Sequence, residues 1–346
     1  MAEYGLPYMG SKSLICDDLI RIFPKADNFY DLFGGGFSVT NALLVRRKND
    51  YKEFHFNEIR PGICDLVKDA IAGKYSYKVF KPAWVSREEF FLKKDFDPYV
   101  KLCFSFGNNG KAYMFSKEIE PYKKSLHNAI VFNDFDGLAS LTLGMKKFND
   151  NYSIPQKRIY LRNRIEFFRK TKVPEFLYPF LKDEQLKVVN ELTQLRQLQQ
   201  LERLERLEQL ERLERLERLQ QLEQLERLER LEQLEQLERL YFYSTSYELV
   251  PIKPNSIIYC DIPYQGTADY DDGDNKFDHR KFFDWAADQI NPVFISEYNV
   301  SDKRFVPIFK INKRSLLSSD KTMKQKVEKV YANRAAQNII FDKPTS

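Results

Sequence analysis

The sequence predicts an α/β fold in which a central sheet is interrupted by a long insertion. Residues 28–59 have the pattern of a strand, a glycine-rich turn, a helix and a second strand, the unit from which doubly wound sheets are built. Residues 192–240 are a leucine repeat, and residues 241–346 return to short apolar strands with a helix among them. We therefore expect one fold that is built from both ends of the chain.

The glycine-rich turn and the strand after it are typical of nucleotide-binding sheets. "NFYDLFGGGFSVTNALL" (28–44) predicts a short strand, the turn and the start of a helix, and "YKEFHFNEI" (51–59) predicts a strand that ends in an acid. Three consecutive glycines, which let a backbone approach a ligand closely, are Gly34, Gly35 and Gly36. Glu58 lies 22 residues beyond the last of them, near the spacing at which a carboxylate takes ribose hydroxyls. A plain tight turn is the alternative.

Residues 86–190 have a basic and aromatic character. Lysines are interspersed with Phe and Tyr, and "QKRIYLRNRIEFFRK" (156–170) is rich in arginine. Cations beside aromatic rings suit a surface that pairs with phosphates and stacks on bases, so Arg158, Arg162 and Arg164 are candidate phosphate contacts. A solvated helix face with its aromatic side chains turned inward is the alternative.

Residues 192–240 form a low-complexity insertion. Leucine occupies every third position from Leu192 to Leu240, with Glu, Arg and Gln between. The composition favours a helix, but a step of three residues slips back by about 60° on an α-helix, so the leucines circle the helix in about 18 residues. We therefore expect a helix that packs on itself or on a partner, with self-association as one possibility and a compact solenoid as the alternative.

After the repeat the strand pattern resumes. "YFYSTSYELVPIKPNSIIYCDIPY" (241–264) predicts alternating strands, and the following sequence predicts a helix over 277–288 and a strand over 292–297. "KTMKQKVEKVYANR" then leads towards a final strand at "QNIIF" (337–341). The apolar run before residue 261 ends in an acid, with a proline and a tyrosine close behind.

Composition limits the classes of protein. The 346 residues are 43% hydrophobic and carry a net charge of +5. The repeat holds twelve Glu and nine Arg, so the remainder carries +8, which suits an anionic partner. The N-terminus lacks the apolar core of a signal peptide and no 18-residue apolar stretch occurs, which indicates a cytoplasmic protein with no membrane span.

Cysteine and histidine usage predicts no metal site. The chain has three histidines and no CxxC pair, and metal centres of the common kinds need closely spaced ligands. We expect the four cysteines to be buried, reduced thiols: Cys16, Cys64, Cys103 and Cys260.

Several stretches, in this order, resemble the Dam-type DNA adenine methyltransferases of bacteria and their phages. "YMGSK" (8–12) is similar to the family's N-terminal cofactor motif, "DLFGGGFS" (31–38) to its methionine-binding loop, "NEI" (57–59) to the stretch with the ribose-binding acid, and "YCDIPY" (259–264) to its catalytic tetrad. "FGNNGKAYMFS" (106–116), "FISEY" (294–298) and "VEKVYANR" (327–334) also resemble family stretches. The similarity covers most of 1–85 and 241–346, and is patchier over 86–190.

The resemblance implies a cofactor, a partner and a domain order. The fold would be a Rossmann-like S-adenosylmethionine-dependent methyltransferase sheet (1–85 and 241–346), with a smaller, mostly helical DNA-recognition region (86–190) and the inserted repeat (191–240). The cofactor would be S-adenosyl-L-methionine and the partner double-stranded DNA, in the cytoplasm of a bacterium or a phage-infected host. The implied cofactor-binding residues are Tyr8, Gly10, Lys12, Asp31, Phe33, Gly34, Gly35, Gly36, Glu58, Tyr247 and Asp261. The implied DNA-binding residues, besides the three arginines, are Asn108, Asn109 and Lys111.

The catalytic residues implied are Asp261, Ile262, Pro263 and Tyr264. The lone pair of an adenine amino group is delocalised into the ring, and two acceptors for its N–H bonds would free that pair for attack on a methyl group. The Asp261 carboxylate and the carbonyl of Ile262 would be these acceptors, Pro263 would stiffen the turn, and Tyr264 would stack on the flipped base.

Two positions depart from the family pattern. Ile262 stands where the family has a second proline, and Glu58 where Asp is commoner. Because poorly aligned reacting atoms lower a rate by orders of magnitude, we expect activity that is retained but lower.

Two other functions fit parts of the pattern. A cytosine amino methyltransferase would share the fold, although such enzymes more often have Ser in place of Asp261. A catalytically impaired DNA-binding or scaffold protein, assembled through the repeat, would account for Ile262. Simpler structural roles are a turn cap for Asp261, a surface position for Lys12, a solvated loop for Glu58 and core packing for Tyr247.

Overall fold

The computed structural model describes residues 4–136, 147–149, 151–171, 220–232, 234, 237–264, 277–314 and 325–341. Backbone alone is described for residues 164–171, 220–223, 237, 311–314 and 325–326. The chain divides into two compact units, Met1–Gly73 with Arg227–Ser346, and Lys74–Glu226. The first unit is thus assembled from both ends of the chain.

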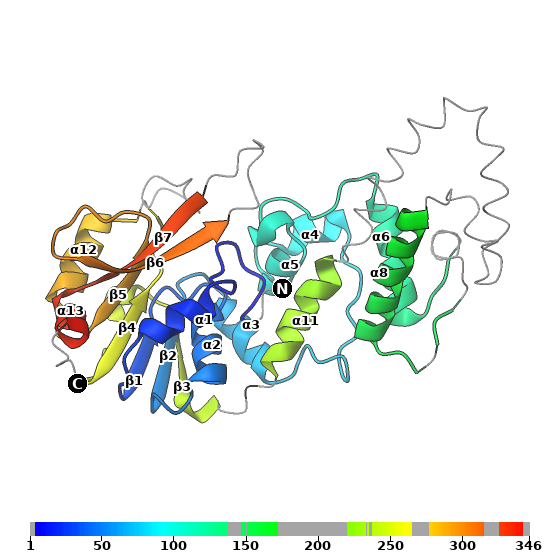
Figure 1. Cartoon of the computed structure of the whole chain (residues 1–346). Coiled ribbons are helices and arrows are strands. Elements are labelled where there is room, and N and C mark those ends of the chain that lie inside the picture. The colour runs from blue at the N-terminus through cyan, green and yellow to red at the C-terminus, as the bar shows by residue number, and fades with distance from the viewer. Residues whose placement is uncertain are drawn as a thin grey trace. The chain divides into compact units, whose positions relative to one another are not determined.

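Seven strands in the described part of the first unit form a mixed sheet (Figure 1). They are β1 (Asn28–Asp31), β2 (Glu53–Asn57), β3 (Leu240–Tyr243), β4 (Ser256–Cys260), β5 (Val293–Glu297), β6 (Val306–Arg314) and β7 (Gln325–Ala332). The order is β3-β2-β1-β4-β5-β7-β6. The first five strands are parallel, and β7 pairs antiparallel with both β5 and β6. The predicted α/β fold is confirmed, as a mostly parallel sheet that is Rossmann-like in part.

The centre of the sheet is a topological switch point. β1 lies between β2 and β4, so that Phe29 pairs with Phe54 on one side and with Ile257 on the other. Every residue of β1 and β4 is buried, as expected for strands covered on both faces. The chain goes from β1 to β2 and β3 on one side and returns on the other with β4. Open α/β sheets bind ligands beyond the carboxyl ends of the strands at such a point.

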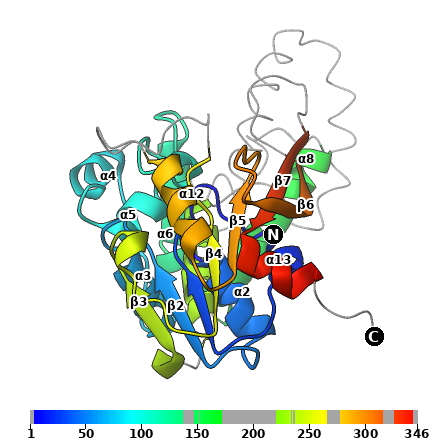
Figure 2. The same ribbon diagram turned by 90° about the vertical axis from the view of Figure 1, so that its left-hand side faces the viewer.

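Helices cover both faces of the sheet (Figures 1 and 2). On one side lie α1 (Cys16–Leu19) and α2 (Ser38–Arg46), and on the other α12 (His279–Asp288). The other described elements of this unit are η1 (Ile20–Ile22), α3 (Ile63–Ile71), the last part of α11 (Gln220–Leu231), η5 (Leu237–Arg239), η6 (Tyr247–Leu249) and α13 (Arg334–Phe341). Successive side chains of a strand point to opposite faces of the sheet. On one face, Phe29 and Tyr259 pack around Phe23, which follows η1. On the other face, Tyr30 and Ile258 belong to the hydrophobic core that contains the buried side chains of α12.

The final strand predicted at "QNIIF" (337–341) is wrong. These residues belong to helix α13, and the last strand is β7. The backbone N–H of Ala336 donates to Oδ1 of Asn333 at 3.0 Å, which satisfies one of the donors left open at a helix start. An asparagine followed by Arg, Ala, Ala and Gln is a helix-start signal. This signal outweighs the preference of the two isoleucines in "QNIIF" for a strand.

The second unit is helical over most of its described residues. Its elements are α4 (Arg87–Lys93), α5 (Pro98–Cys103), η2 (Phe106–Asn108), α6 (Glu120–Phe132), α8 (Ile154–Thr171) and the first part of α11 (Gln220–Leu231). Helix α4 begins with a capping box between Ser86 and Glu89, and the Asp97 side chain caps α5. Each of these caps satisfies backbone donors that the helix leaves unpaired.

One part of the leucine repeat is an α-helix, whereas its last leucine, Leu240, begins strand β3. Helix α11 spans Gln220–Leu231, so the helix prediction is confirmed there, while residues 192–219 lie outside the described residues. Leu225, Leu228 and Leu231 are all buried, with at most 1% exposed. Three successive leucines of the repeat therefore face the protein interior.

Two compositional predictions can be compared with the structure. The four cysteines, Cys16, Cys64, Cys103 and Cys260, are free and buried, as expected. Among the described residues, no helix combines the length and the apolar character that crossing a membrane requires.

Candidate active site

Acidic side chains gather at the carboxyl edge of the sheet. Asp31 ends β1, Glu58 directly follows β2, and Asp261 directly follows β4. Because these strands are parallel neighbours, the three acids lie at one edge, beside the switch point. Glu328 joins them from β7.

Lys12 brings a cation from the N-terminal segment into this cluster. Its Nζ lies 2.7 Å from Oδ2 of Asp261 and 3.2 Å from Oε1 of Glu328. It also donates a hydrogen bond of 2.7 Å to the hydroxyl of Tyr264. Burial alone would lower the pKa of Lys12, but the carboxylates of Asp261 and Glu328 outweigh it and raise that pKa above its ordinary value. Lys12 is thus a buried ammonium group on the predicted tetrad rather than a surface lysine.

The hydroxyl of Tyr264 is held from two sides. It accepts from Lys12 and donates to Oε1 of Glu328 at 2.8 Å. The ring of Tyr298 stands nearly perpendicular to that of Tyr264, with 4.6 Å between centroids. Burial and the nearby charges of Asp261 and Glu328 raise the pKa of Tyr264 far above its usual value, so the phenol keeps its proton. These contacts fix the orientation of the ring before any ligand arrives.

Asp31 is a buried acid with one unused acceptor. Its Oδ2 accepts from the Thr40 hydroxyl at 2.8 Å, while Oδ1 is buried and has no hydrogen-bond partner among the described residues. Burial raises the pKa of Asp31 to about 7; the Thr40 hydrogen bond opposes this rise, and the charges of Asp261 and Glu58 add to it. An orphaned buried oxygen of this kind is a candidate contact for a bound ligand.

The three glycines are required by the protein's own packing. A Cβ at Gly34 would lie 2.1 Å from the ring of Phe56, and one at Gly36 would lie 2.5 Å from Cβ of Tyr8. Gly35 has a φ of +51° and faces the same tyrosine ring. We attributed these glycines to the close approach of a ligand, but the atoms beside them are those of Phe56 and Tyr8. Tyr8 therefore packs directly on the loop.

Glu58 braces the glycine loop. Its carboxylate accepts the backbone N–H groups of Gly35 at 2.8 Å and of Arg60 at 3.0 Å. Arg60 in turn donates to the hydroxyl of Tyr8 at 2.8 Å. Burial raises the pKa of Glu58, while the hydrogen bonds and charge around it oppose the rise. The acid predicted for ribose is thus buried at the loop rather than solvated beside it.

Two further residues predicted to bind the cofactor form an aromatic wall. The ring centroids of Phe33 and Tyr247 are 5.4 Å apart. Tyr247 is only 9% exposed and also packs on Phe282 of α12, so most of its ring is core. Gly10, by contrast, is exposed, in the segment that leads from Tyr8 to Lys12.

The turn that carries the tetrad is fixed by α12. Ile262 is 2% exposed and belongs to the core cluster that contains Phe282 and Ala286. The carbonyl of Pro263 accepts a hydrogen bond of 2.7 Å from Nε2 of His279, at the start of the same helix. Contacts with a helix therefore hold this turn where the family pattern would have a second proline.

The arginines predicted to contact DNA belong to the second unit and differ in their surroundings. Arg158 forms an ion pair with Glu226 of α11, and its side chain is 12% exposed. Arg162 is exposed, and the side chain of Arg164 lies outside the described residues.

The other predicted DNA contacts shape a loop of the same unit. Asn108 has a positive φ of 56° and donates to the Leu102 carbonyl at 2.8 Å. Oδ1 of Asn109 accepts the backbone N–H of Lys111, also at 2.8 Å. The side chain of Lys111 is exposed, and it is the member of the three that can meet a phosphate without rearranging this loop.

Sequence reasoning missed three residues of the site: Glu328, Tyr298 and His279. A signal for Glu328 was present, because it is in phase with Val330 and Ala332, the buried face of β7. A charged residue in phase with buried apolar positions of a strand is rare and needs a partner. No comparable signal marks His279, whose contact is with a distant backbone carbonyl.

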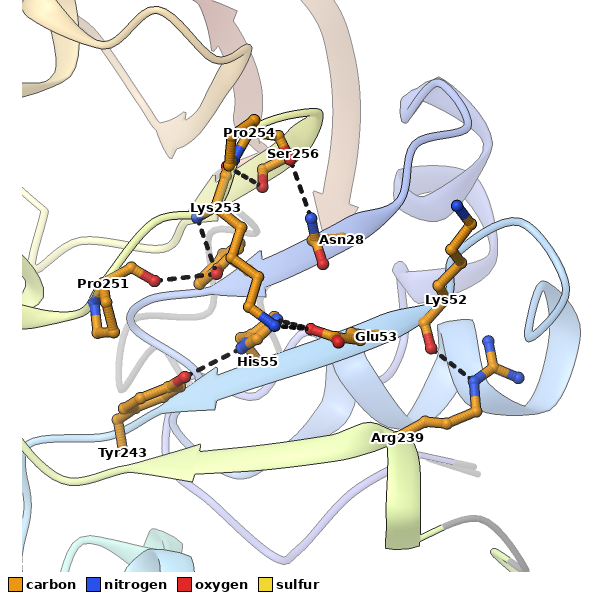
Figure 3. A network of polar contacts seen from close by, with 11 residues as sticks. Asn28, Lys52, Glu53, His55, Arg239, Tyr243, Pro251, Lys253, Pro254 and Ser256 are labelled. Carbon is orange, nitrogen blue, oxygen red and sulfur yellow. Dashed lines mark hydrogen bonds and ion pairs between the residues drawn. The ribbon is translucent and has the colours of Figure 1, made fainter.

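A second polar network lies at the opposite edge of the sheet (Figure 3). Glu53, at the amino end of β2, contacts Lys253 at 2.5 Å and Nε2 of His55 at 3.1 Å. Nδ1 of His55 is 3.1 Å from the Tyr243 hydroxyl. The His55 ring stacks on the ring of Tyr30, with 4.1 Å between the ring centroids. Because ligands of open sheets bind at the carboxyl edge, we regard this network as a structural tie between strands.

Comparisons with known proteins do not assign the chain to a family. No protein-family model matches it, and no curated protein matches it.

Proposed function

We propose that the chain is a DNA methyltransferase that transfers a methyl group from S-adenosyl-L-methionine to the exocyclic amino group of adenine. The observation that carries this proposal is the contact of Lys12 with Asp261 and Tyr264. Lys12 and Tyr264 are 252 residues apart in the sequence, and the two motifs that contain them resemble one methyltransferase family. They converge beside the switch point of the sheet, where such sheets bind ligands.

The charge of the site suits this cofactor. Lys12 is paired with Asp261 and Glu328, and two further acids, Asp31 and Glu58, follow from the neighbouring strands at the same edge of the sheet. S-adenosylmethionine carries a sulfonium and an ammonium group, and a nearby cation stabilises a buried carboxylate. The unused Oδ1 of Asp31 is the acceptor best suited to a cationic group. With Phe33 and Tyr247 as the apolar wall, these residues fit the cofactor, which would supply a methyl carbon bound to positively charged sulfur.

The tetrad supplies the groups that the reaction needs. In this proposal the Asp261 carboxylate and the Ile262 carbonyl accept the two N–H bonds of the target amino group, which localises the nitrogen lone pair. Tyr264 stacks on the base, in the orientation that Lys12 and Glu328 already hold. Preformed orientation of this kind lowers the barrier because little reorganisation remains for the reaction itself.

Double-stranded DNA is the proposed partner. An enzyme of this class cannot reach the amino group inside a duplex, so the target nucleotide must be rotated out of the stack. The second unit, with the exposed side chains of Lys111 and Arg162, is the proposed contact surface for phosphates.

The test is methyl transfer to DNA. The protein is incubated with methyl-labelled S-adenosylmethionine and unmethylated duplex DNA, and the modified nucleoside is identified after digestion. We expect methyladenine from the wild type and none from Asp261→Ala. Glu53→Gln, which removes an ion-paired acid at the opposite edge of the sheet, is the matched control and should retain activity.

Other products would change the proposal. Methylcytosine would indicate the cytosine amino methyltransferase. Cofactor binding without any transfer would indicate the binding or scaffold role.

A further inference from the structure

A continuous line of hydrogen bonds leads away from Asp261. Asp261 contacts the Lys12 ammonium at 2.7 Å, Lys12 donates to the Tyr264 hydroxyl at 2.7 Å, and Tyr264 donates to Glu328 at 2.8 Å. Lys12 donates both to Asp261 and to Tyr264, and Tyr264 donates onwards to Glu328. Glu328 is 1% exposed, so the line ends on a carboxylate inside the protein.

The end of this line is a group that can take up a proton. Glu328 is a buried carboxylate, and a carboxylate accepts a proton to become a neutral acid. A proton is what the proposed reaction must dispose of.

We propose that Asp261, Lys12, Tyr264 and Glu328 form a proton wire that carries the excess proton of the methylated amino group to Glu328. The inference rests on the proposed methyl transfer and adds to it a role for Glu328. It also gives the hydroxyl of Tyr264 a task that stacking on a base does not need.

The steps balance. The adenine nitrogen bonds to the methyl carbon as the electron pair of the methyl–sulfur bond stays with sulfur, which leaves the nitrogen positively charged with two hydrogens. One of these passes as a proton to the Asp261 carboxylate. The Lys12 ammonium group has no free lone pair, so it first gives a proton to Tyr264 as Tyr264 gives its own to Glu328. The neutral amine of Lys12 then takes the proton from Asp261. Asp261 is again a carboxylate, Lys12 an ammonium group and Tyr264 a phenol, and Glu328 has become a neutral acid.

The wire has a shorter branch and charged or titratable neighbours. Lys12 also contacts Glu328 directly at 3.2 Å, so loss of the Tyr264 hydroxyl would weaken the connection without cutting it. Among the described residues, the other titratable groups that interact with the cluster include Asp31, Tyr259, Tyr298, Cys16 and Cys260. Glu297 acts on Tyr298. The hydroxyl of Tyr259 is hydrogen-bonded to Ser296 at 2.8 Å, and the neighbouring phenol that the wire uses is Tyr264.

The experiment separates a proton acceptor from a merely structural residue. Single-turnover methyl transfer is measured for the wild type, Glu328→Gln, Glu328→Ala and Tyr264→Phe, with cofactor affinity and 2-aminopurine fluorescence at the target base as controls for binding and flipping. Glutamine keeps the size and the acceptor oxygen but takes no proton. We expect Glu328→Gln to slow transfer about 100-fold, within the range of general base catalysis, with binding and flipping nearly unchanged. Tyr264→Phe should lose less.

Rescue of the Glu328→Ala variant by small molecules distinguishes a proton acceptor from a residue that only supports the structure. Formate is a base that fits the space left by Glu328→Ala, whereas formamide has the same shape and is not a base. Rescue by formate and not by formamide would support the wire. Equal rescue by both, or wild-type rates for Glu328→Gln, would overturn it.

Two controls keep the result interpretable. Glu53→Gln removes an acid outside the wire and should transfer methyl groups at the wild-type rate. If the Glu328 variants do not fold, an unchanged rate in Tyr264→Phe would overturn the assigned route through the hydroxyl. Absence of methyl transfer by the wild type would refute the proposed function itself, and the wire with it.

Discussion

The side chain of Ile262 points into the core that α12 covers, and His279 of that helix holds the carbonyl of the next residue. From the sequence, Ile262 looked like a loss of rigidity, because an isoleucine does not restrict the backbone as proline does. In the structure, rigidity comes from packing and a hydrogen bond instead. This packing and this hydrogen bond therefore oppose the loss of activity that the sequence led us to expect.

Ile262→Ala tests this anchoring. Because Ile262 is 2% exposed, the change should lower the free energy of unfolding by about 2–4 kcal/mol, through lost burial and a cavity. Ile290→Ala, at a residue that is 94% exposed, should change it by less than about 0.5 kcal/mol. Urea denaturation of both variants measures the difference. Equal effects would show that the turn is not anchored through Ile262.

The pKa of Asp31 predicts how the stability of the protein changes with pH. Its pKa is raised from 3.8 to about 7 in the folded protein, so between these pH values the folded state binds the proton more tightly than the unfolded state. The free energy of unfolding contributed by this group therefore falls as the pH rises from about 4 to about 7. Asp31→Asn should become more stable than the wild type at pH 8, and this advantage should disappear towards pH 4.

The measurement is the difference in urea midpoint between Asp31→Asn and the wild type, across this pH range. His55 and His127, whose pKa values burial lowers to about 4, destabilise both proteins in acid and cancel in that difference. A difference that does not vary with pH would contradict the assignment.

At the scale of elements, α11 explains how a three-residue repeat can bury its leucines. Each step of three slips back by about 60°, so Leu225, Leu228 and Leu231 span about 120° and share one face. All three are buried. Over 49 residues the same repeat would turn through every direction, which is why the sequence could not say which leucines would be covered.

Leu228→Ala should lower the free energy of unfolding by about 2–5 kcal/mol, because its side chain is fully buried. Leu249→Ala is the matched control, since Leu249 is 71% exposed and its loss should change little. Chemical denaturation followed by circular dichroism compares the two. A negligible effect of Leu228→Ala would show that α11 adds little to the fold.

At the scale of the whole molecule, sequence and structure agree where a local pattern decides the outcome. The turn at Gly34–Gly36, the strands on either side of the insertion and helix α12 were all predicted from period and glycine placement. Helix α13 was missed because a capping asparagine was overlooked. Glu328 was missed because its partners, Lys12 and Tyr264, come from distant parts of the chain, and no local pattern encodes such a contact.

The place of β1 has a consequence for synthesis. Its neighbour on one side, β2, ends at Asn57, but its other neighbour, β4, begins only at Ser256. At about 5–20 residues per second, the nascent strand waits roughly 10–45 s with that edge unpaired. Glu328 emerges later still, so a product that terminates early, inside the repeat, contains Lys12 and the glycine loop but neither Asp261 nor Glu328. Translation must pass the whole repeat before this site can exist.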